Sequence, residues 1–356
     1  MRTNINKNSF KGQVLYIGLD IHKKSWTVSI FSETLYLKTY TQDADTRILI
    51  NYLKVHYPGA QYKCVYEAGY FGFWIQHRLK SAGFDCMVVH PADIPTTDKQ
   101  RHNKRDDSDS RKLARNLRAG TIAGIFIPIL EQQQDRSLVR RRAQMVQSQS
   151  RVKNRIKSFL SFYGIRISEE EAGKYWSRRY IEYLKGIMLY NESGQDSLNS
   201  LLGELDFYRE RILDLTRKIR SLSRTESYRY KINLLVSIPG ISLISAMTIL
   251  TEIMDIRRFK SQERLRSYIG LIPSERSSGE KERKTEMTSR GNREIKRIIV
   301  ESAWTAAAKD PVLTQYFEEL CKRMKKTRAI IRVARRLTNR IMHVLLNEEE
   351  YKLQLS

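Results

Sequence analysis

The sequence predicts an α/β domain at the N-terminus, followed by a mainly helical remainder. Short β-branched runs alternate with helical patterns in the first block, and apolar residues recur at three-and-four spacing over long stretches later. A length of 356 residues is enough for two domains with a helical segment between them. We expect these regions at 1–128, 129–230 and 231–350.

The N-terminal block contains five predicted strands and three predicted helices. An apolar run that ends at Asp20 predicts a buried strand, and two alternating stretches after it complete an antiparallel meander. The predicted order is strand 14–20, strand 26–30, strand 34–40, helix 43–56, strand 61–66, helix 70–82, strand 85–90 and a helix that begins near 106. This is the order of an RNase H-like fold, although similar orders of strands and helices are common in α/β proteins and do not decide the fold alone.

Four carboxylates follow these elements. Asp20 ends the first strand and Glu67 ends the fourth, while Asp106 and Asp109 stand three apart and share one helix face. Alternatively, Asp20 only starts a turn, and Asp106 and Asp109 only stabilise the N-terminus of a helix, where acidic residues are favoured. Four carboxylates at one sheet edge would repel one another unless cations neutralised them. Mg²⁺ or Mn²⁺ takes oxygen ligands, and a pair of such ions can clamp the attacking and leaving oxygens of a phosphodiester.

These residues resemble a known family. The segments Tyr16-Ile-Gly-Leu-Asp20-Ile-His-Lys23, Glu67-Ala68 and Lys104-x-Asp106-x-x-Asp109 are similar to those of the DEDD transposases of the insertion-sequence 110 family. The resemblance implies a RuvC-like domain in which Asp20, Glu67, Asp106 and Asp109 form a catalytic metal-binding tetrad. The sequence departs from the family at Arg105, where threonine is common, and at Ser110, where alanine is common.

The C-terminal block carries the second half of the resemblance. The ordered segments are 235–246, Arg258-Phe259, 268–273, Ser277-Ser278-Gly279 and Gly291-Asn292. The family places a nucleophilic serine just before this glycine, which implies Ser278, with Ser277 remaining possible. From the residues alone, a Ser-Gly cluster predicts a flexible loop.

A second signature lies at the expected turn Pro239-Gly240-Ile241. It resembles a helix-hairpin-helix, in which backbone amides meet phosphate. Ser242 stands where that motif usually has its second glycine, so a plain turn is the alternative for Gly240.

The middle region predicts two long amphipathic helices. Apolar residues fall seven apart from Leu138 to Phe159, and three-and-four spacing runs from Leu198 to Leu222. We expect a coiled-coil hairpin here. Its seam could pair subunits into a dimer or tetramer, or could close within one chain.

The charge of the chain predicts a polyanionic partner. Lysine and arginine total 64 against 39 acidic residues, a formal charge of +25. Two basic segments without acidic residues, 136–160 and 322–340, and the loop expected beside Ser278 are the candidate nucleic-acid contacts. These candidates are Arg140, Arg141, Arg142, Arg151, Lys153, Arg155, Lys281, Arg283, Lys284, Arg290, Arg328, Arg332 and Arg336. Tyrosines interleaved with basic residues in the middle region could stack unpaired bases.

The predicted function is that of a transposase or serine recombinase that cuts and rejoins donor and target DNA. Ser278 would act as a metal-assisted nucleophile, and the resemblance adds a structured guide RNA. The alternatives are a Holliday-junction-type nuclease that uses water and a non-catalytic nucleic-acid scaffold. No apolar stretch approaches the roughly 20 residues of a membrane span, and three scattered cysteines suit a reducing compartment. We therefore expect a cytoplasmic, nucleoid-associated protein.

Overall fold

The computed structural model describes residues 10–95, 106–168, 170, 173–278, 281–287 and 291–353. The side chains of 106–108, 273–278 and 281–287 lie outside this description. The chain divides into two compact units, 1–127 and 128–356, and each is described by itself. The contacts group 128–356 as one unit, so a division near 230 stays a prediction.

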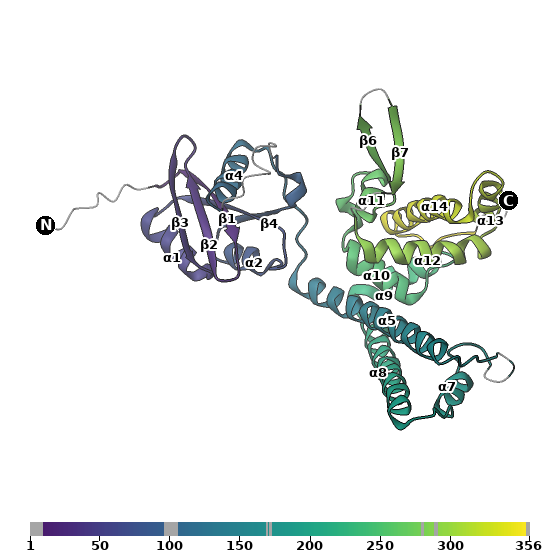
Figure 1. Ribbon diagram of the computed structural model, residues 1–356. Coiled ribbons are helices and arrows are strands. Elements are labelled where there is room, and N and C mark those ends of the chain that lie inside the picture. The colour runs from purple at the N-terminus through teal and green to yellow at the C-terminus, as the bar shows by residue number, and fades with distance from the viewer. Residues whose placement is uncertain are drawn as a thin grey trace. The chain divides into compact units, whose positions relative to one another are not determined.

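Unit 1 is built on a five-stranded mixed sheet (Figure 1). Its elements are β1 Val14–Ile21, β2 Ser25–Phe31, β3 Tyr36–Asp43, α1 Thr46–His56, β4 Gln61–Glu67, α2 Trp74–Ser81, β5 Asp85–Val89, the 3₁₀ turn η1 Pro91–Asp93 and α4 Asp106–Ala119. The strand order is β3-β2-β1-β4-β5. β2 lies antiparallel to β1 and β3, whereas β4 lies parallel to β1 and β5. The predicted order of strands and helices in this block is confirmed.

Helices cover both faces of this sheet. Leu15, Ile17 and Leu19 of β1 are fully buried and pack in one cluster with apolar residues of α1 and α2. On the opposite face, Val65 of β4 packs with Leu113 of α4. Because side chains alternate along a strand, the even-numbered residues of β1 face α4.

In the residues that the structure describes, the regular structure of unit 2 is helical apart from one hairpin (Figure 1). Its elements are α5 Leu130–Phe162, α7 Arg178–Lys185, α8 Glu192–Leu222, α9 Glu226–Val236, α10 Leu243–Ile253, the 3₁₀ turn η2 Ile256–Arg258, α11 Gln262–Ile269, β6 Pro273–Ser278, β7 Lys281–Met287, α12 Arg293–Lys309, α13 Pro311–Cys321 and α14 Lys326–Asn347. Helices α9 to α14 enclose one large apolar cluster. Among the described residues, no helix combines the length and apolar character that crossing a membrane would need.

The two long helices of the middle region are α5 and α8, which pack against each other. Val152 and Ile156 of α5 share a buried cluster with Leu198 and Leu205 of α8, and the short helix α7 adds Leu184 to it. These contacts lie within one chain. The two predicted long helices are confirmed, while the supercoiled geometry of a coiled coil stays a prediction.

The segment that follows Ser278 differs from the expected loop. Lys281, Arg283 and Lys284 lie on strand β7, which pairs antiparallel with β6 and brings Ser278 opposite Lys281. Apart from Pro273 and Met287 at their ends both strands are polar, so neither shows the apolar alternation by which a strand is recognised in sequence. The loop prediction for these three residues is wrong. The position of Arg290 lies outside the described residues.

A buried charge pair fixes the end of unit 2. Asp310 is fully buried and accepts hydrogen bonds from Arg340, from the Leu313 amide at the start of α13 and from the Tyr351 hydroxyl. Burial alone would raise the pKa of Asp310, but the bonds from Arg340, Leu313 and Tyr351 outweigh it, so its pKa lies below the usual value. The pair joins α13, α14 and the C-terminal segment.

Asp310→Asn should lower the free energy of unfolding of unit 2 by about 3 kcal/mol at pH 7, because it leaves the Arg340 charge buried without its partner. A depressed folded pKa stabilises the protein above the unfolded value of about 3.9, and this contribution is lost as pH falls through the folded pKa. Urea unfolding at pH 7 and at pH 3 should therefore show a difference between variant and wild type that narrows in acid. A difference that stays constant would contradict this assignment.

Candidate metal centre and serine hairpin

Asp20 and Glu67 lie side by side at one edge of the sheet. β1 and β4 run parallel, and the last pair in register is Leu19 with Tyr66, so the two carboxylates come one residue later on neighbouring strands. Strands in register are about 4.8 Å apart, and paired residues share a face of the sheet. Asp20 follows Gly18 by two residues, and Glu67 follows Val65 by two. Both carboxylates therefore belong to the face that α4 covers.

Helix α4 rests on this face at Gly18. A Cβ atom at Gly18 would come 2.0 Å from the Ser110 carbonyl oxygen and 2.6 Å from the Ala114 nitrogen, so glycine is required here. Farther along α4, Arg115 and Arg118 lie over the ring of Phe31, which pairs with Tyr16. Because α4 passes from the level of Gly18 to that of Tyr16, it runs antiparallel to β1.

This direction turns the first residues of α4 toward Asp20. From Ser110 back to Asp106 the helix rises about 6 Å, and from Gly18 to Asp20 the strand rises about 6.7 Å. Asp106, the first residue of α4, and Asp109 thus come near the level of Asp20 and Glu67. The Asp109 side chain is half-buried, and that of Asp106 lies outside the description.

A chain of hydroxyl groups holds the start of α4 on the sheet. The fully buried Ser110 Oγ lies 2.8 Å from Ser29 Oγ, which lies 2.7 Å from Thr39 Oγ1. Arg111 Nε donates to the same Thr39 oxygen at 3.0 Å. Ser110, a departure from the usual alanine, thus binds the helix to β2, and Ser29 and Thr39 are positioning residues that sequence reasoning missed.

The four candidate ligands are all carboxylates, which is the ligand type that a divalent ion such as Mg²⁺ prefers. Carboxylate oxygens are the ligands that Mg²⁺ and Mn²⁺ take, and three elements deliver them to one edge. Among the side chains that the structure describes, no three metal-binding groups already surround a single point. Asp20 instead lies 3.3 Å from His22 Nε2. The residues fit a divalent metal ion in ligand type, and metal binding by these four carboxylates stays a prediction.

Ser278 lies in the other unit, where it is the last residue of strand β6 and pairs with Lys281 of β7. The two strands form a hairpin (Figure 1). The two ends of the hairpin meet at a pair of glycines: a Cβ on Gly291 would come 2.6 Å from Gly270 Cα. Gly270 closes α11 in the left-handed conformation, and the Asn292 amide donates to the Tyr268 carbonyl oxygen at 2.8 Å. The segments 268–273 and Gly291-Asn292 thus form the base of the serine hairpin.

A buried carboxylate anchors this base. Glu252 of α10 is 1% exposed and accepts from Arg140 Nε and Nη2 at 2.6 and 2.7 Å, in the two-pronged geometry of a strong charge pair. Asn292 Nδ2 donates to the same carboxylate at 2.6 Å, while its Oδ1 caps α12. The long helix α5 is therefore joined to the foot of the hairpin.

The candidate basic residues have different surroundings. Arg140 contacts Glu252, Arg142 donates to Thr216 at 2.7 Å, and Arg155 lies 3.4 Å from Glu204. Exposed candidates are Arg141, Arg151, Arg328, Arg332 and Arg336, of which Arg336 also lies over the ring of Tyr316. Lys153 is half-buried beside Trp176. Phosphate binding by any of these residues stays a prediction.

Comparison with known proteins identifies the family. A model of the IS116/IS110/IS902 transposase family matches residues 232–318, and the transposase model for the DEDD proteins of IS110 matches residues 17–165. The chain belongs to the IS110 family of DEDD transposases. The second match contains Asp20, Glu67, Asp106 and Asp109, and this type of domain implies dependence on a divalent metal ion.

Related transposases align over much of the chain. A putative transposase, y4qE, of Sinorhizobium fredii is 28% identical over 82% of this chain and 71% of its own length. The transposase for insertion sequence element IS1533 of Leptospira borgpetersenii is 27% identical over 68% of this chain and 70% of its own. The transposase for IS1111A of Coxiella burnetii is 24% identical, with 76% and 74% covered.

Divalent ions should stabilise unit 1 through the carboxylate edge. At a metal concentration one hundred times Kd, binding contributes about 2.7 kcal/mol, which raises the melting temperature by several degrees. Asp20→Asn should lose most of this shift in Mg²⁺ or Mn²⁺ relative to EDTA. Asp85→Asn is the matched control, because Asp85 is an exposed carboxylate at the start of β5. An undiminished shift in Asp20→Asn would contradict the assignment.

Proposed function

We propose that this transposase cuts DNA strands with Ser278 as the nucleophile and rejoins them through a covalent phosphoserine. The observation that carries the proposal is the placement of Asp20 and Glu67 at adjacent strand ends beneath α4. The serine hairpin supports it, since a nucleophile at the end of a two-stranded arm can reach a phosphodiester in an extended substrate.

The tetrad of Asp20, Glu67, Asp106 and Asp109 would hold one or two Mg²⁺ or Mn²⁺ ions. A bound ion supplies neutralisation of phosphate charge and lowers the pKa of an attacking hydroxyl. Around it, the chain holds the carboxylates in place: β1 and β4 set the spacing of Asp20 and Glu67, and the Ser110–Ser29 bond fixes the helix that carries Asp109.

Strand transfer takes two balanced steps. In the first, Ser278 Oγ forms a bond to phosphorus, the bond from phosphorus to one sugar oxygen breaks, and that oxygen leaves as a hydroxyl after taking a proton. The serine proton passes to a carboxylate or to solvent. In the second, a hydroxyl of another strand attacks the phosphoserine, and the serine oxygen recovers a proton. No external energy source is needed, because each step makes one phosphodiester bond for each one broken.

A structured guide RNA is the proposed second partner, and the tip of the α5–α8 pair supports it. Lys153 lies 5.4 Å from the ring of Trp176, and Lys157 lies 4.8 Å from that of Tyr175. Tyr175 is half exposed, and basic groups beside aromatic rings suit unpaired bases. We further propose that α5 and α8 form a coiled coil, that two or four copies assemble on donor and target DNA, and that the protein works in the cytoplasm at the nucleoid.

Ser278→Ala should abolish the covalent adduct between protein and end-labelled DNA in the presence of Mg²⁺ or Mn²⁺, because no other oxygen replaces Oγ. Ser277→Ala is the matched control and should keep the adduct. Denaturing gel electrophoresis measures both. An adduct that survives in Ser278→Ala, or that disappears in Ser277→Ala alone, would overturn the assignment. Cleavage by the wild type without any adduct would favour the water-using nuclease.

The protein purified from its own cells should carry one discrete structured transcript. Sequencing of the bound RNA after gentle lysis measures this, and the expected result is strong enrichment of a single species over total RNA. Random cellular RNA bound in proportion to its abundance would count against a guide, although the DNA chemistry of Ser278 would be unaffected.

A further inference from the structure

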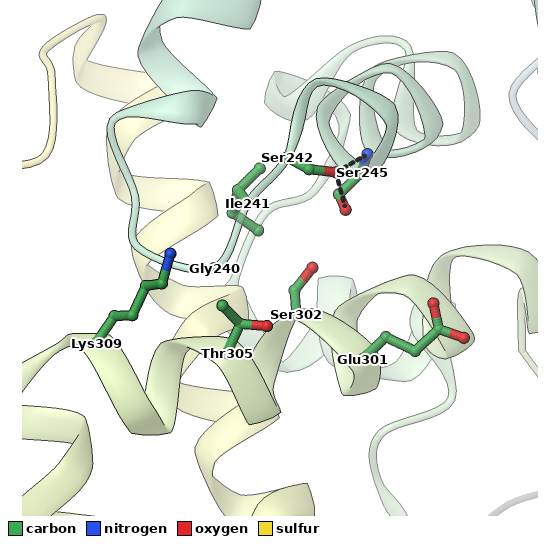
Figure 2. Close-up of a pocket in the computed structure, with 8 residues that line it drawn as sticks. All are labelled: Gly240, Ile241, Ser242, Ser245, Glu301, Ser302, Thr305 and Lys309. Atoms are coloured by element: carbon green, nitrogen blue, oxygen red, sulfur yellow. Dashed lines mark hydrogen bonds between the residues drawn. The ribbon is translucent and has the colours of Figure 1, made fainter. Parts of the chain in front are cut away.

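A polar pocket of about 330 Å³ lies in unit 2, away from the serine hairpin. One wall is the turn Gly240–Ser242 between α9 and α10, and the other is α12 (Figure 2). From α12, Ser302, Thr305 and Lys309 reach into it, at the spacing of one helix face. Neither the tetrad nor Ser278 lines this pocket.

Gly240 brings the turn close to the helix. Its φ is +92°, and a Cβ atom would come 2.5 Å from the Ser302 carbonyl oxygen and 2.8 Å from the Ala306 nitrogen. No other residue type meets both demands without displacing α12. The plain turn expected for Gly240 is therefore also a close packing contact, and it places the turn over Ser302.

The turn presents backbone donors that are still unused. Within the described parts of the chain, no acceptor is found for the amides of Gly240, Ser242, Leu243 and Ile244. Ser242 caps α10 by accepting from the Ser245 amide at 3.1 Å, which leaves the preceding amides available. Free amides at a helix start attract anions.

Ser302 supplies an independent observation. Its side chain is only 4% exposed, its hydroxyl points toward the turn, and it has no hydrogen-bond partner among the described residues. Because this oxygen opens into the polar pocket and no neighbouring group that the structure describes engages it, it is available to donate a hydrogen bond to a ligand that binds there.

The charge of the pocket favours an anion. The amino group of Lys309 points toward the Gly240 turn, and within the described residues it has no acidic partner. The neighbouring Asp310 is occupied by Arg340. Glu301 lies at the rim, but Arg297 lies 3.1 Å from it and compensates its charge. One ammonium and two hydroxyls of α12 thus reach the pocket, and the Gly240–Ser242 turn with its unused amides borders it.

We propose that this pocket binds a phosphate group of a nucleic-acid backbone. A phosphate offers several acceptor oxygens and a negative charge, which matches this set of donors, and the net charge of +25 makes nucleic acid the fitting source. A backbone contact carries no base specificity but fixes orientation, so the site would hold DNA or RNA in register on unit 2. The inference rests on the proposed function in one respect, that nucleic acid is the ligand.

Lys309→Gln in the full chain should weaken binding about tenfold, as expected for one lost charge-assisted contact. Fluorescence anisotropy with labelled duplex DNA and, separately, single-stranded RNA measures affinity in EDTA, so that no strand is cleaved. The slope of log K against log salt should fall by about 0.9 for duplex or about 0.7 for a single strand. The nucleic acid that shows the change is the one that occupies the pocket.

Lys260→Gln is the matched control, because Lys260 is exposed and its removal costs the same single charge. Ser302→Ala should weaken binding roughly fivefold with an unchanged salt slope, since it loses a hydrogen bond but no charge. If Lys309→Gln and Lys260→Gln lose the same affinity for both nucleic acids, phosphate binding in the pocket is contradicted, while the proposed function is left intact. Failure of the wild type to bind either nucleic acid would overturn both.

Discussion

The close packing of α4 on β1 at Gly18 is the constraint on which the proposed metal centre depends. Asp20 and Glu67 are neighbours by strand pairing alone, but Asp106 and Asp109 come from a different element. The absence of a side chain at Gly18 lets the backbone of α4 lie directly on the strand. The Ser110–Ser29 hydrogen bond then fixes the helix there, so that the start of α4 comes near the sheet edge where Asp20 and Glu67 lie.

A comparable constraint organises the second unit. Glu252 is buried, yet its carboxylate is bound by Arg140 of α5 and by Asn292 at the foot of the serine hairpin. A buried charge is tolerated only when such partners satisfy it, so the arrangement of these three residues is strongly specified. The Gly270–Gly291 contact closes the same foot. The hairpin that carries Ser278, the proposed nucleophile, is therefore anchored at its base by two separate sets of contacts.

Much of the first unit could be predicted from the sequence because β1, β2 and β5 are rich in apolar and β-branched residues. Asp20 and Glu67 could be placed at strand ends for the same reason. The packing of α4 on Gly18 could not be predicted, since a glycine in a strand indicates that another segment approaches closely but does not identify that segment. The β6–β7 hairpin escaped prediction because both of its strands are polar apart from their ends. Arg140 resembled a free cation because its partner Glu252 lies 112 residues later in the chain.

Locating a bound metal ion is the most direct test of the carboxylate assignment. Crystals of the protein grown with Mn²⁺ should show anomalous scattering from manganese at the carboxyl edge of β1 and β4, within coordination distance of Asp20, Glu67 and Asp109. Asp20→Asn crystals grown in the same way should lose that signal. Saturating manganese with no peak at this edge, or with its peaks confined to other carboxylates, would contradict the claim that α4 and the sheet assemble a metal centre.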